Sequence, residues 1–250
     1  MHTMFVQIAV AKTGRNDTPS GNETVEIIER PSGGQSVIFC GGIRSGVKNK
    51  TISSIVVNQI IEKVGEGERD GSSIRNVSDQ INRQYLGEAS GDCCMMSVDF
   101  ESGTLVVSRL TSTPVWYYQR GELNVWNMAA APLGSDKGLH PSITEIPIET
   151  GSSVIFLSGG ILRAGQFEEY EGGDFNGDIC SIAEEDMSAQ TMADLILNHA
   201  VSLDMNSPRD DMTAIVMRVM SGRPNYTKLN ISCPVPDYEV QKINSFGVFF

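Results

Sequence analysis

Short runs rich in valine and isoleucine, each bounded by glycine or proline, recur along most of this sequence. Three such runs open the chain, at Phe5–Ala11, Thr24–Glu29 and Ser36–Cys40. The cluster Pro31–Gly34 separates the second run from the third. Because β-branched residues favour strands and glycine and proline interrupt them, the chain is expected to open with consecutive β-strands.

Apolar residues recur at helical spacing in two stretches after these strands. The first stretch runs from Ser45 to Val64, and the second runs from about Ser73 to Tyr85 after the turn Asp70-Gly71. A third helix is expected around Ala189–Leu203. Helices are therefore expected in separate groups and not after every strand.

The middle of the chain returns to strand-like runs. Glu101–Gly103 separates two of them and Arg120–Glu122 separates two more, which predicts two β-hairpins. Further strands are expected at Ile143–Ile148, Ser153–Leu157 and Thr213–Val219. Runs of strands with helices in separate pairs favour an α+β layered fold over a sheet built from βαβ units.

Length and charge narrow the class of protein. With 250 residues, of which 40% are hydrophobic, one large domain is the simplest expectation. The formal charge of −12 opposes binding to nucleic acid and to anionic membrane surfaces. The longest apolar runs fall far short of the roughly 20 residues of a membrane helix, and the first ten residues lack the basic start and apolar centre of a signal peptide. A soluble, cytoplasmic protein is therefore expected.

Cysteine and histidine carry no recognisable catalytic pattern. The five cysteines are an odd number without a CxxC motif or a nearby histidine, so we interpret them as reduced core or strand residues. They are Cys40, Cys93, Cys94, Cys180 and Cys233. The three histidines are far apart in sequence, and none is expected to be catalytic.

Three short motifs lie where predicted strands meet turns. They are Cys40–Gly46, Ser158–Gly160 and Arg209–Thr213. Taken alone, the first two are glycine turns in which the backbone can adopt a positive φ. Their order along the chain, and the strands that flank them, indicate that they are more than glycine turns.

The stretch from about Val6 to Val219 resembles the type 2C metal-dependent serine/threonine protein phosphatases, most closely their bacterial SpoIIE-like branch. In that family Ala-Asp-Gly ends a strand that leads to a long helix, as Cys40-Gly41-Gly42 does here. A Pro-Leu-Gly then precedes a strand ending in Ser/Thr-Asp-Gly, and here Pro132–Gly134 precedes Ser158–Gly160. The family closes with Asp-Asp, an apolar residue and Thr, which Asp210–Thr213 matches residue for residue.

The resemblance implies an α+β fold in the form of a four-layer α-β-β-α sandwich, with two mainly antiparallel sheets flanked by helices. Residues 1–221 would form this phosphatase-like domain. Residues 222–250 would form a C-terminal tail, with Leu229–Ser232 as a candidate edge strand before a flexible end.

Family chemistry implies two divalent cations, Mg²⁺ or Mn²⁺, held between strand ends by oxygen ligands. A metal-activated water would attack phosphorus while the ions offset the charge that develops on the phosphoryl oxygens. In this chain the family's metal positions correspond to Asp210, to the backbone carbonyl of Gly42 and, less closely, to Asp211. No residue is assigned a direct catalytic role.

Three acidic positions of the family are neutral here. Gly41 and Gly159 stand in place of two aspartates, and Asn22 stands in place of the aspartate of an early Ser-Gly-Asp. Glu23 could substitute for the last of these, but strand alternation would place its side chain on the opposite face. Because a dinuclear site needs several carboxylates, no tightly bound cofactor is expected, and Mg²⁺ or Mn²⁺ would bind only to a working site.

Three hypotheses for function remain open, so we do not decide whether the chain is an enzyme. The first is a pseudophosphatase of bacterial signalling that binds a phosphoprotein or another regulatory partner. The second is an active phosphatase whose metal site is rebuilt from other carboxylates, and the third is a structural or oligomerising module. The rebuilt site would use Asp210, Asp211 and some of Glu23, Asp174 and Asp178.

Two further features bear on these hypotheses. The acidic stretch Glu168–Asp178 is either a source of ligands or a solvated loop of an acidic protein. Arg44, beside the glycine turn, is either an anion-binding residue in a cleft without carboxylates or an ordinary surface arginine.

The SpoIIE-like branch implies bacterial partner switching or stress signalling. The partner would be a phosphorylated anti-sigma-factor antagonist or a similar regulator, by analogy at the level of the fold. No nucleic-acid or membrane partner is expected, and the oligomeric state stays open.

Overall fold

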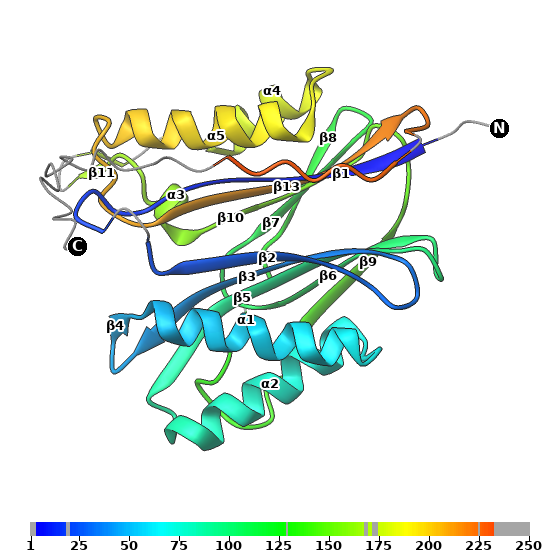
Figure 1. Ribbon diagram of the computed structural model, residues 1–250. Helices are drawn as coiled ribbons and strands as arrows, with labels where there is room; N and C mark the ends of the chain where they lie inside the picture. The colour runs from blue at the N-terminus through cyan, green and yellow to red at the C-terminus, as the bar shows by residue number, and fades with distance from the viewer. Residues whose placement is uncertain are drawn as a thin grey trace, which may run out of the picture.

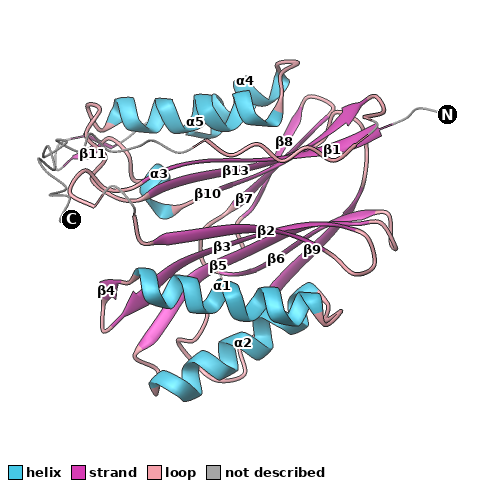
Figure 2. Ribbon diagram, viewed as in Figure 1, coloured by secondary structure: helices cyan, strands magenta, loops and turns pink. Residues whose placement is uncertain are grey.

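The computed structural model describes residues 4–18, 21–128, 130–167, 170–171, 175–224 and 226–232. Two antiparallel sheets face each other, and helices cover their outer faces (Figures 1 and 2). The α+β, four-layer architecture implied by the resemblance is therefore confirmed.

The first sheet, which we call sheet I, has the strand order β1-β13-β10-β7-β8, and every neighbouring pair is antiparallel. Its strands are β1 (Met4–Thr13), β13 (Met212–Ser221), β10 (Ser153–Leu157), β7 (Val115–Gln119) and β8 (Glu122–Trp126). Strand β13 lies between β1 and β10, so the last strand of the described chain is an interior strand of this sheet.

Sheet II has the strand order β2-β3-β5-β6-β9, again antiparallel, and the short strand β4 pairs with the end of β3. Its strands are β2 (Glu23–Glu29), β3 (Gly34–Arg44), β4 (Val47–Lys48), β5 (Ala89–Asp99), β6 (Thr104–Leu110) and β9 (Ser142–Pro147). A separate two-stranded ribbon consists of β11 (Gln166–Phe167) and β12 (Tyr170–Glu171).

Helices pack in pairs against the two sheets (Figure 1). Sheet II is covered by α1 (Lys50–Gly65) and α2 (Asp70–Tyr85), and sheet I by α4 (Phe175–Glu184) and α5 (Ala189–Leu203). A single turn, α3 (Gly159–Leu162), directly follows β10. Asn49 caps α1 by accepting a 3.1 Å hydrogen bond from the amide of Ile52, which satisfies one of the free amides at the helix start.

Several predicted boundaries differ from the structure. The helix expected from Ser45 begins at Lys50, because β3 continues to Arg44 and a turn with positive φ at Ser45 and Gly46 leads into β4. The acidic stretch that was weighed as a loop contains the start of α4 at Phe175.

The tail also differs from its prediction. The edge strand expected at 229–232 is absent, since these residues have no regular secondary structure. Residues 233–250 lie outside the described residues.

Apolar side chains fill three layers. One cluster lies between sheet I and the helices α4 and α5, and another lies between sheet II and the helices α1 and α2. The third lies between the sheets, where the rings of Phe39 and Phe156 have centroids 4.8 Å apart. Each sheet is therefore buried on both faces, which explains strands that are apolar almost throughout, such as β10.

The four described cysteines are free, and three of them are buried in strands, as predicted. Cys233 lies outside the described residues. Among the described helices, none combines the length and the apolar character that crossing a membrane would require.

Candidate functional site

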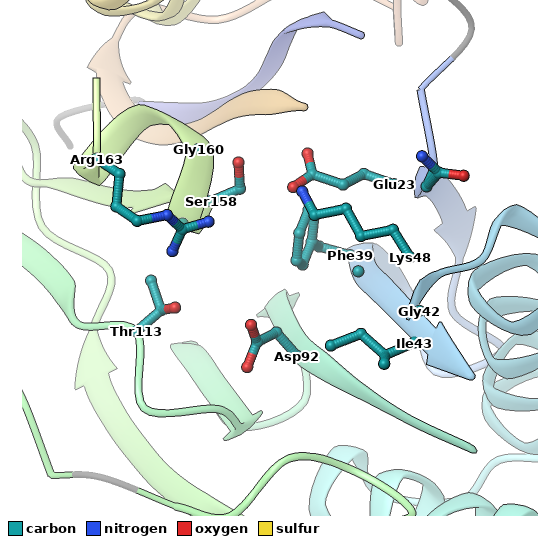
Figure 3. A pocket seen from close by; sticks show the side chains of 13 residues that line it. Glu23, Phe39, Gly42, Ile43, Lys48, Asp92, Thr113, Ser158, Gly160 and Arg163 are labelled. Atoms are coloured by element: carbon teal, nitrogen blue, oxygen red, sulfur yellow. The ribbon is translucent and has the colours of Figure 1, made fainter. Parts of the chain in front are cut away.

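A cavity of about 180 Å³ lies at one end of the two sheets, where strands β2, β3 and β4 approach the turn after β10 and helix α3 (Figure 3). It is lined by Asn22, Glu23, Phe39, Gly41, Gly42, Ile43, Lys48, Asp92, Thr113, Ser158, Gly159, Gly160 and Arg163. The three family positions that are neutral in this chain, Asn22, Gly41 and Gly159, therefore line one cavity.

Strand register brings Glu23, Gly41 and Asp92 into one row. Gly41 pairs with Glu23 of β2 on one side and with Asp92 of β5 on the other. Directly opposed residues have side chains on the same face of a sheet, and both carboxylates line the cavity (Figure 3). The expectation that Glu23 points to the face opposite Asn22 is wrong, because Asn22 precedes β2 in a bend where strand alternation does not apply.

The Glu23 side chain is buried beside the start of β13. Thr213 donates a 2.5 Å hydrogen bond from Oγ1 to Oε2 of Glu23. Burial raises the pKa of Glu23 to about 7, although the hydrogen bond from Thr213 and the charge of Lys48 act to lower it. Glu23 is therefore partly protonated near neutral pH, and a protonated carboxyl is a poor ligand for a hard cation.

Asp210, just before β13, is held by two cationic side chains. Nζ of Lys48 contacts Oδ1, and Nη2 of Arg163 lies 2.7 Å from Oδ2. The amide of Asp211 also donates to Oδ1, over 2.7 Å. Burial acts to raise the pKa of Asp210, but the hydrogen bonds from Lys48 and Arg163 outweigh it and the pKa is lowered. Both carboxylate oxygens therefore already have cationic partners.

Asp211 is buried, with 1% of its surface exposed. Its Oδ2 accepts hydrogen bonds from the backbone amide of Asn22 at 2.8 Å and from Nδ2 of Asn22 at 3.2 Å. Its Oδ1 accepts from the amide of Arg15 at 3.1 Å. Asp211 therefore ties Arg15 and Asn22 to the start of β13, and these bonds occupy its two oxygens.

Gly42 is required by close packing, and its carbonyl has a partner. A Cβ at this position would lie 2.4 Å from the amide nitrogen of Ser53 and 2.7 Å from the carbonyl oxygen of Asn49. The Gly42 carbonyl accepts a 2.8 Å hydrogen bond from the Asn49 amide. The oxygen predicted as a metal ligand thus belongs to the turn that begins α1.

Gly41 and Gly159 differ in the space beside them. The nearest heavy atom to a Cβ on Gly41 would be Cζ of Phe39 at 3.6 Å, an ordinary contact distance. A Cβ on Gly159 would lie only 2.7 Å from Nη1 of Arg163 and 3.3 Å from Cζ of the same side chain. The guanidinium of Arg163 therefore occupies the space that a side chain at position 159 would need.

Sequence analysis missed Lys48 and Arg163. Arg163 follows Gly159 by four residues, but this spacing brings the two positions together only through the short helix α3, which the sequence does not predict. Arg44, the candidate anion-binding residue, is exposed and does not line the cavity. Its guanidinium carbon lies 5.4 Å from the centroid of the Tyr85 ring.

The carboxylates considered for a rebuilt site do not all gather at the cavity. Asp178 lies in α4, where Oδ2 is 3.0 Å from Nε2 of His199 of α5. Asp174 lies outside the described residues. Within the described part of the chain, no group of three or more His, Cys, Asp or Glu is placed to hold a metal ion. The residues that the structure describes at this cavity therefore do not fit a pair of divalent cations.

Solved structures share this fold. The phosphatase domain of SpoIIE from Bacillus subtilis, with a fragment of its regulatory domain, aligns with a TM-score of 0.73 and 14% identity over 90% of this chain and 66% of that one. This chain thus spans just under two thirds of that structure. RsbX in complex with magnesium aligns with a TM-score of 0.63 and 13% identity, over 88% of this chain and 100% of that one.

A third likeness is to the catalytic domain of the serine/threonine protein phosphatase PstP in complex with two manganese ions. The TM-score is 0.65 and the identity 12%, over 87% of this chain and 100% of that one. At such low identities, these structures establish the fold alone.

Sequence comparison establishes the family. A comparison with curated proteins finds no match. Residues 45–220 match the family described as Stage II sporulation protein E (SpoIIE), and this match covers well over half of the 250 residues. The chain therefore belongs to the SpoIIE family, a bacterial branch of the type 2C (PPM) serine/threonine phosphatases, as its motifs predicted.

Proposed function

We propose that this protein is a pseudophosphatase that keeps the SpoIIE fold and its cavity but acts by binding a protein partner and not by hydrolysis. The proposal rests on the ion pairs of Asp210, whose two carboxylate oxygens contact Lys48 and Arg163. A carboxylate whose charge is already balanced by two cations attracts a divalent metal ion weakly.

The other family metal positions do not supply the negative charge that Asp210 no longer offers to a metal ion. Gly41, Gly159 and Asn22 supply no carboxylate, and Asp211 accepts three hydrogen bonds from Arg15 and Asn22. Two dications close together need formal negative charge near both of them. The cavity therefore supports a role in binding better than a role in metal-dependent hydrolysis.

The proposed partner is a phosphorylated anti-sigma-factor antagonist or a similar regulator in the bacterial cytoplasm, for which an active paralogue could compete. Membership of the SpoIIE family supports a signalling role. The cavity lining also includes Lys48, Arg163, Thr113 and Ser158, whose side chains can donate hydrogen bonds to a phosphoryl group.

A metal-dependent phosphatase with a rebuilt site is the second candidate, because Glu23 and Asp92 also face the cavity. Both carboxyl groups have partners, however. Glu23 accepts from Thr213, and Oδ1 of Asp92 accepts a 2.7 Å hydrogen bond from Oγ1 of Thr111. A rebuilt site would have to break these contacts as well as those of Asp210.

Hydrolysis of a phosphoserine peptide with excess Mn²⁺ or Mg²⁺ separates the two candidates. We expect the wild-type protein and the Asp210→Ala variant to give the same background rate. Turnover that depends on added metal and disappears in Asp210→Ala would refute the pseudophosphatase and favour the rebuilt site. Asp178→Ala is a matched control, since that carboxylate lies on α4 and should not affect the rate in either case.

Binding of the same peptide tests the proposed role itself. Calorimetry should detect binding of the phosphorylated peptide that is weakened in Lys48→Met and Arg163→Met. Equal results for the phosphorylated and unphosphorylated peptides would remove the support for phosphoprotein recognition. Absence of binding to either peptide would favour the structural or oligomerising module.

A further inference from the structure

We infer that Lys48 and Arg163 are built-in cations that take the place of divalent metal ions at this site and keep such ions out. The inference rests on the proposed loss of metal-dependent hydrolysis and specifies how the site is held together without metal. Relatives with this fold have been solved with magnesium or with two manganese ions. In this chain Asp210, which the family resemblance matches to a metal ligand, is bound by two of the chain's own side chains.

Lys48 connects the two sheets. It lies in β4, which pairs with the end of β3 in sheet II, whereas Asp210 and Asp211 precede β13 in sheet I. Its ammonium group contacts Asp210 and lies 3.9 Å from Oδ2 of Asp211. The Lys48 side chain is 39% exposed and that of Asp210 is 24% exposed, so the contact is partly shielded from water. One ammonium thus approaches two neighbouring carboxylates across the sheets.

Arg163 and Gly159 are complementary in shape. The guanidinium lies where a side chain at position 159 would project, and from there it reaches Oδ2 of Asp210 at 2.7 Å. In the family, an aspartate stands at the position of Gly159. The space that a side chain would need at position 159 is therefore filled by a basic group from the following turn.

Two further lysines hold the backbone of Glu23, whose side chain lines the cavity. Nζ of Lys50 and Nζ of Lys12 donate hydrogen bonds to the carbonyl of Glu23 at 2.7 Å and 3.1 Å. A divalent cation entering the cavity would have to separate Asp210 from Lys48 and Arg163, which both line it. Because like charges at short range repel strongly in a partly buried site, the chain's own cations oppose metal binding.

Restoring the missing acids distinguishes exclusion by these cations from simple loss of ligands. Two variants are titrated with Mn²⁺ by calorimetry, the acid-restored Gly41→Asp/Gly159→Asp and the same variant with Lys48→Met and Arg163→Met added. We expect the second to bind Mn²⁺ about tenfold more tightly or better, since two nearby positive charges have been removed. Equal affinities, or weaker binding by the second variant, would overturn the inference.

A matched control uses a cation outside the cavity. Arg120 pairs with Glu149 at 2.9 Å, and its side chain is 81% exposed. Adding Arg120→Met to the acid-restored variant should leave the Mn²⁺ affinity unchanged. A gain as large as that from Lys48→Met and Arg163→Met would contradict a local effect.

A second measurement keeps the test decisive if the acid-restored variants fail to fold. In the wild-type background, Lys48→Met/Arg163→Met should lower the Tm, because Asp210 is left without its cationic partners. Adding Asp210→Asn should recover part of the loss. No recovery would show that the two side chains contribute packing only, and it would overturn the inference while leaving the proposed function in place. Metal-dependent turnover by the wild-type protein would instead refute the proposed function itself.

Discussion

Thr213 donates a 2.5 Å hydrogen bond from Oγ1 to Oε2 of Glu23, and this bond joins β13 of sheet I to β2 of sheet II. On the sheet I side, the Thr213 amide donates to Oγ of Ser158 at 2.9 Å. On the sheet II side, Lys50 donates to the Glu23 carbonyl at 2.7 Å. Groups of the chain itself thus connect the two sheets beside the cavity that Glu23 and Ser158 line.

The stability of the protein should therefore depend on the protonation of Glu23. Burial raises the pKa of Glu23 from 4.5 to about 7 in the folded chain. Between these two values the folded state holds a proton that the unfolded state has released, so the free energy of unfolding falls as pH rises and levels off above about pH 7. A shift of this size corresponds to at most about 3 kcal/mol.

Urea unfolding of the wild type and of Glu23→Gln, between about pH 5 and pH 8, measures this effect. The variant has no proton to lose at this position, so the wild type should lose stability relative to it as pH rises. A constant difference between the two proteins across this range would contradict the assignment.

Gly41 and Gly42 are neighbours that should differ strongly in how much stability an alanine costs. A Cβ on Gly42 would lie 2.4 Å from a backbone nitrogen of α1, whereas a Cβ on Gly41 would have its nearest contact at 3.6 Å. We expect Gly42→Ala to cost about 3 kcal/mol or to prevent folding, and Gly41→Ala to cost less than about 1 kcal/mol. Chemical denaturation of both variants compares them directly, and similar losses would be inconsistent with this packing.

A buried ion pair holds α2 against sheet II. Nη1 of Arg30 lies 2.6 Å from Oδ1 of Asp70 and also donates to Ser36 at 2.9 Å. Removing the cation leaves a buried carboxylate, so Arg30→Met should lower the free energy of unfolding by about 3 kcal/mol. The double variant Arg30→Met/Asp70→Asn should recover part of this loss, and a double variant as unstable as the sum of its single changes would argue against the pairing.

The buried thiols should be protected from labelling in the native protein. Burial raises the pKa of Cys40, Cys93 and Cys94, and it also blocks reagents, whereas Cys180 is partly exposed. Peptide mapping after a short exposure to a thiol reagent should therefore find these three far less modified than Cys180. Equal modification would mean that the strands β3 and β5 open readily.

Much of the fold was predictable because local patterns determine it. Val and Ile runs bounded by glycine and proline located most of the strands, and apolar spacing located α2 and α5. The α1 boundary was missed because the β3–β4 turn at Ser45 and Gly46 depends on pairing between distant strands. Helix α3 was missed because its four residues are too few to show a period.

The site was predictable only in part. Asn22, Gly41 and Gly159 line one cavity because Asn22 directly precedes β2, Gly41 lies near the end of β3 and Gly159 begins the turn after β10. The role of Lys48 could not be inferred, since its partner Asp210 is 162 residues away and the contact exists only after both sheets have formed. Local sequence likewise gives no measure of the burial that shifts the pKa of Glu23.

Calorimetric titration of Mn²⁺ into the wild-type protein tests the central claim most directly. The ion pairs of Asp210 with Lys48 and Arg163 predict no saturable binding at metal concentrations up to the millimolar range. Stoichiometric, tight binding that is lost in the Asp210→Ala variant would contradict this account and show that the cavity still forms a metal centre.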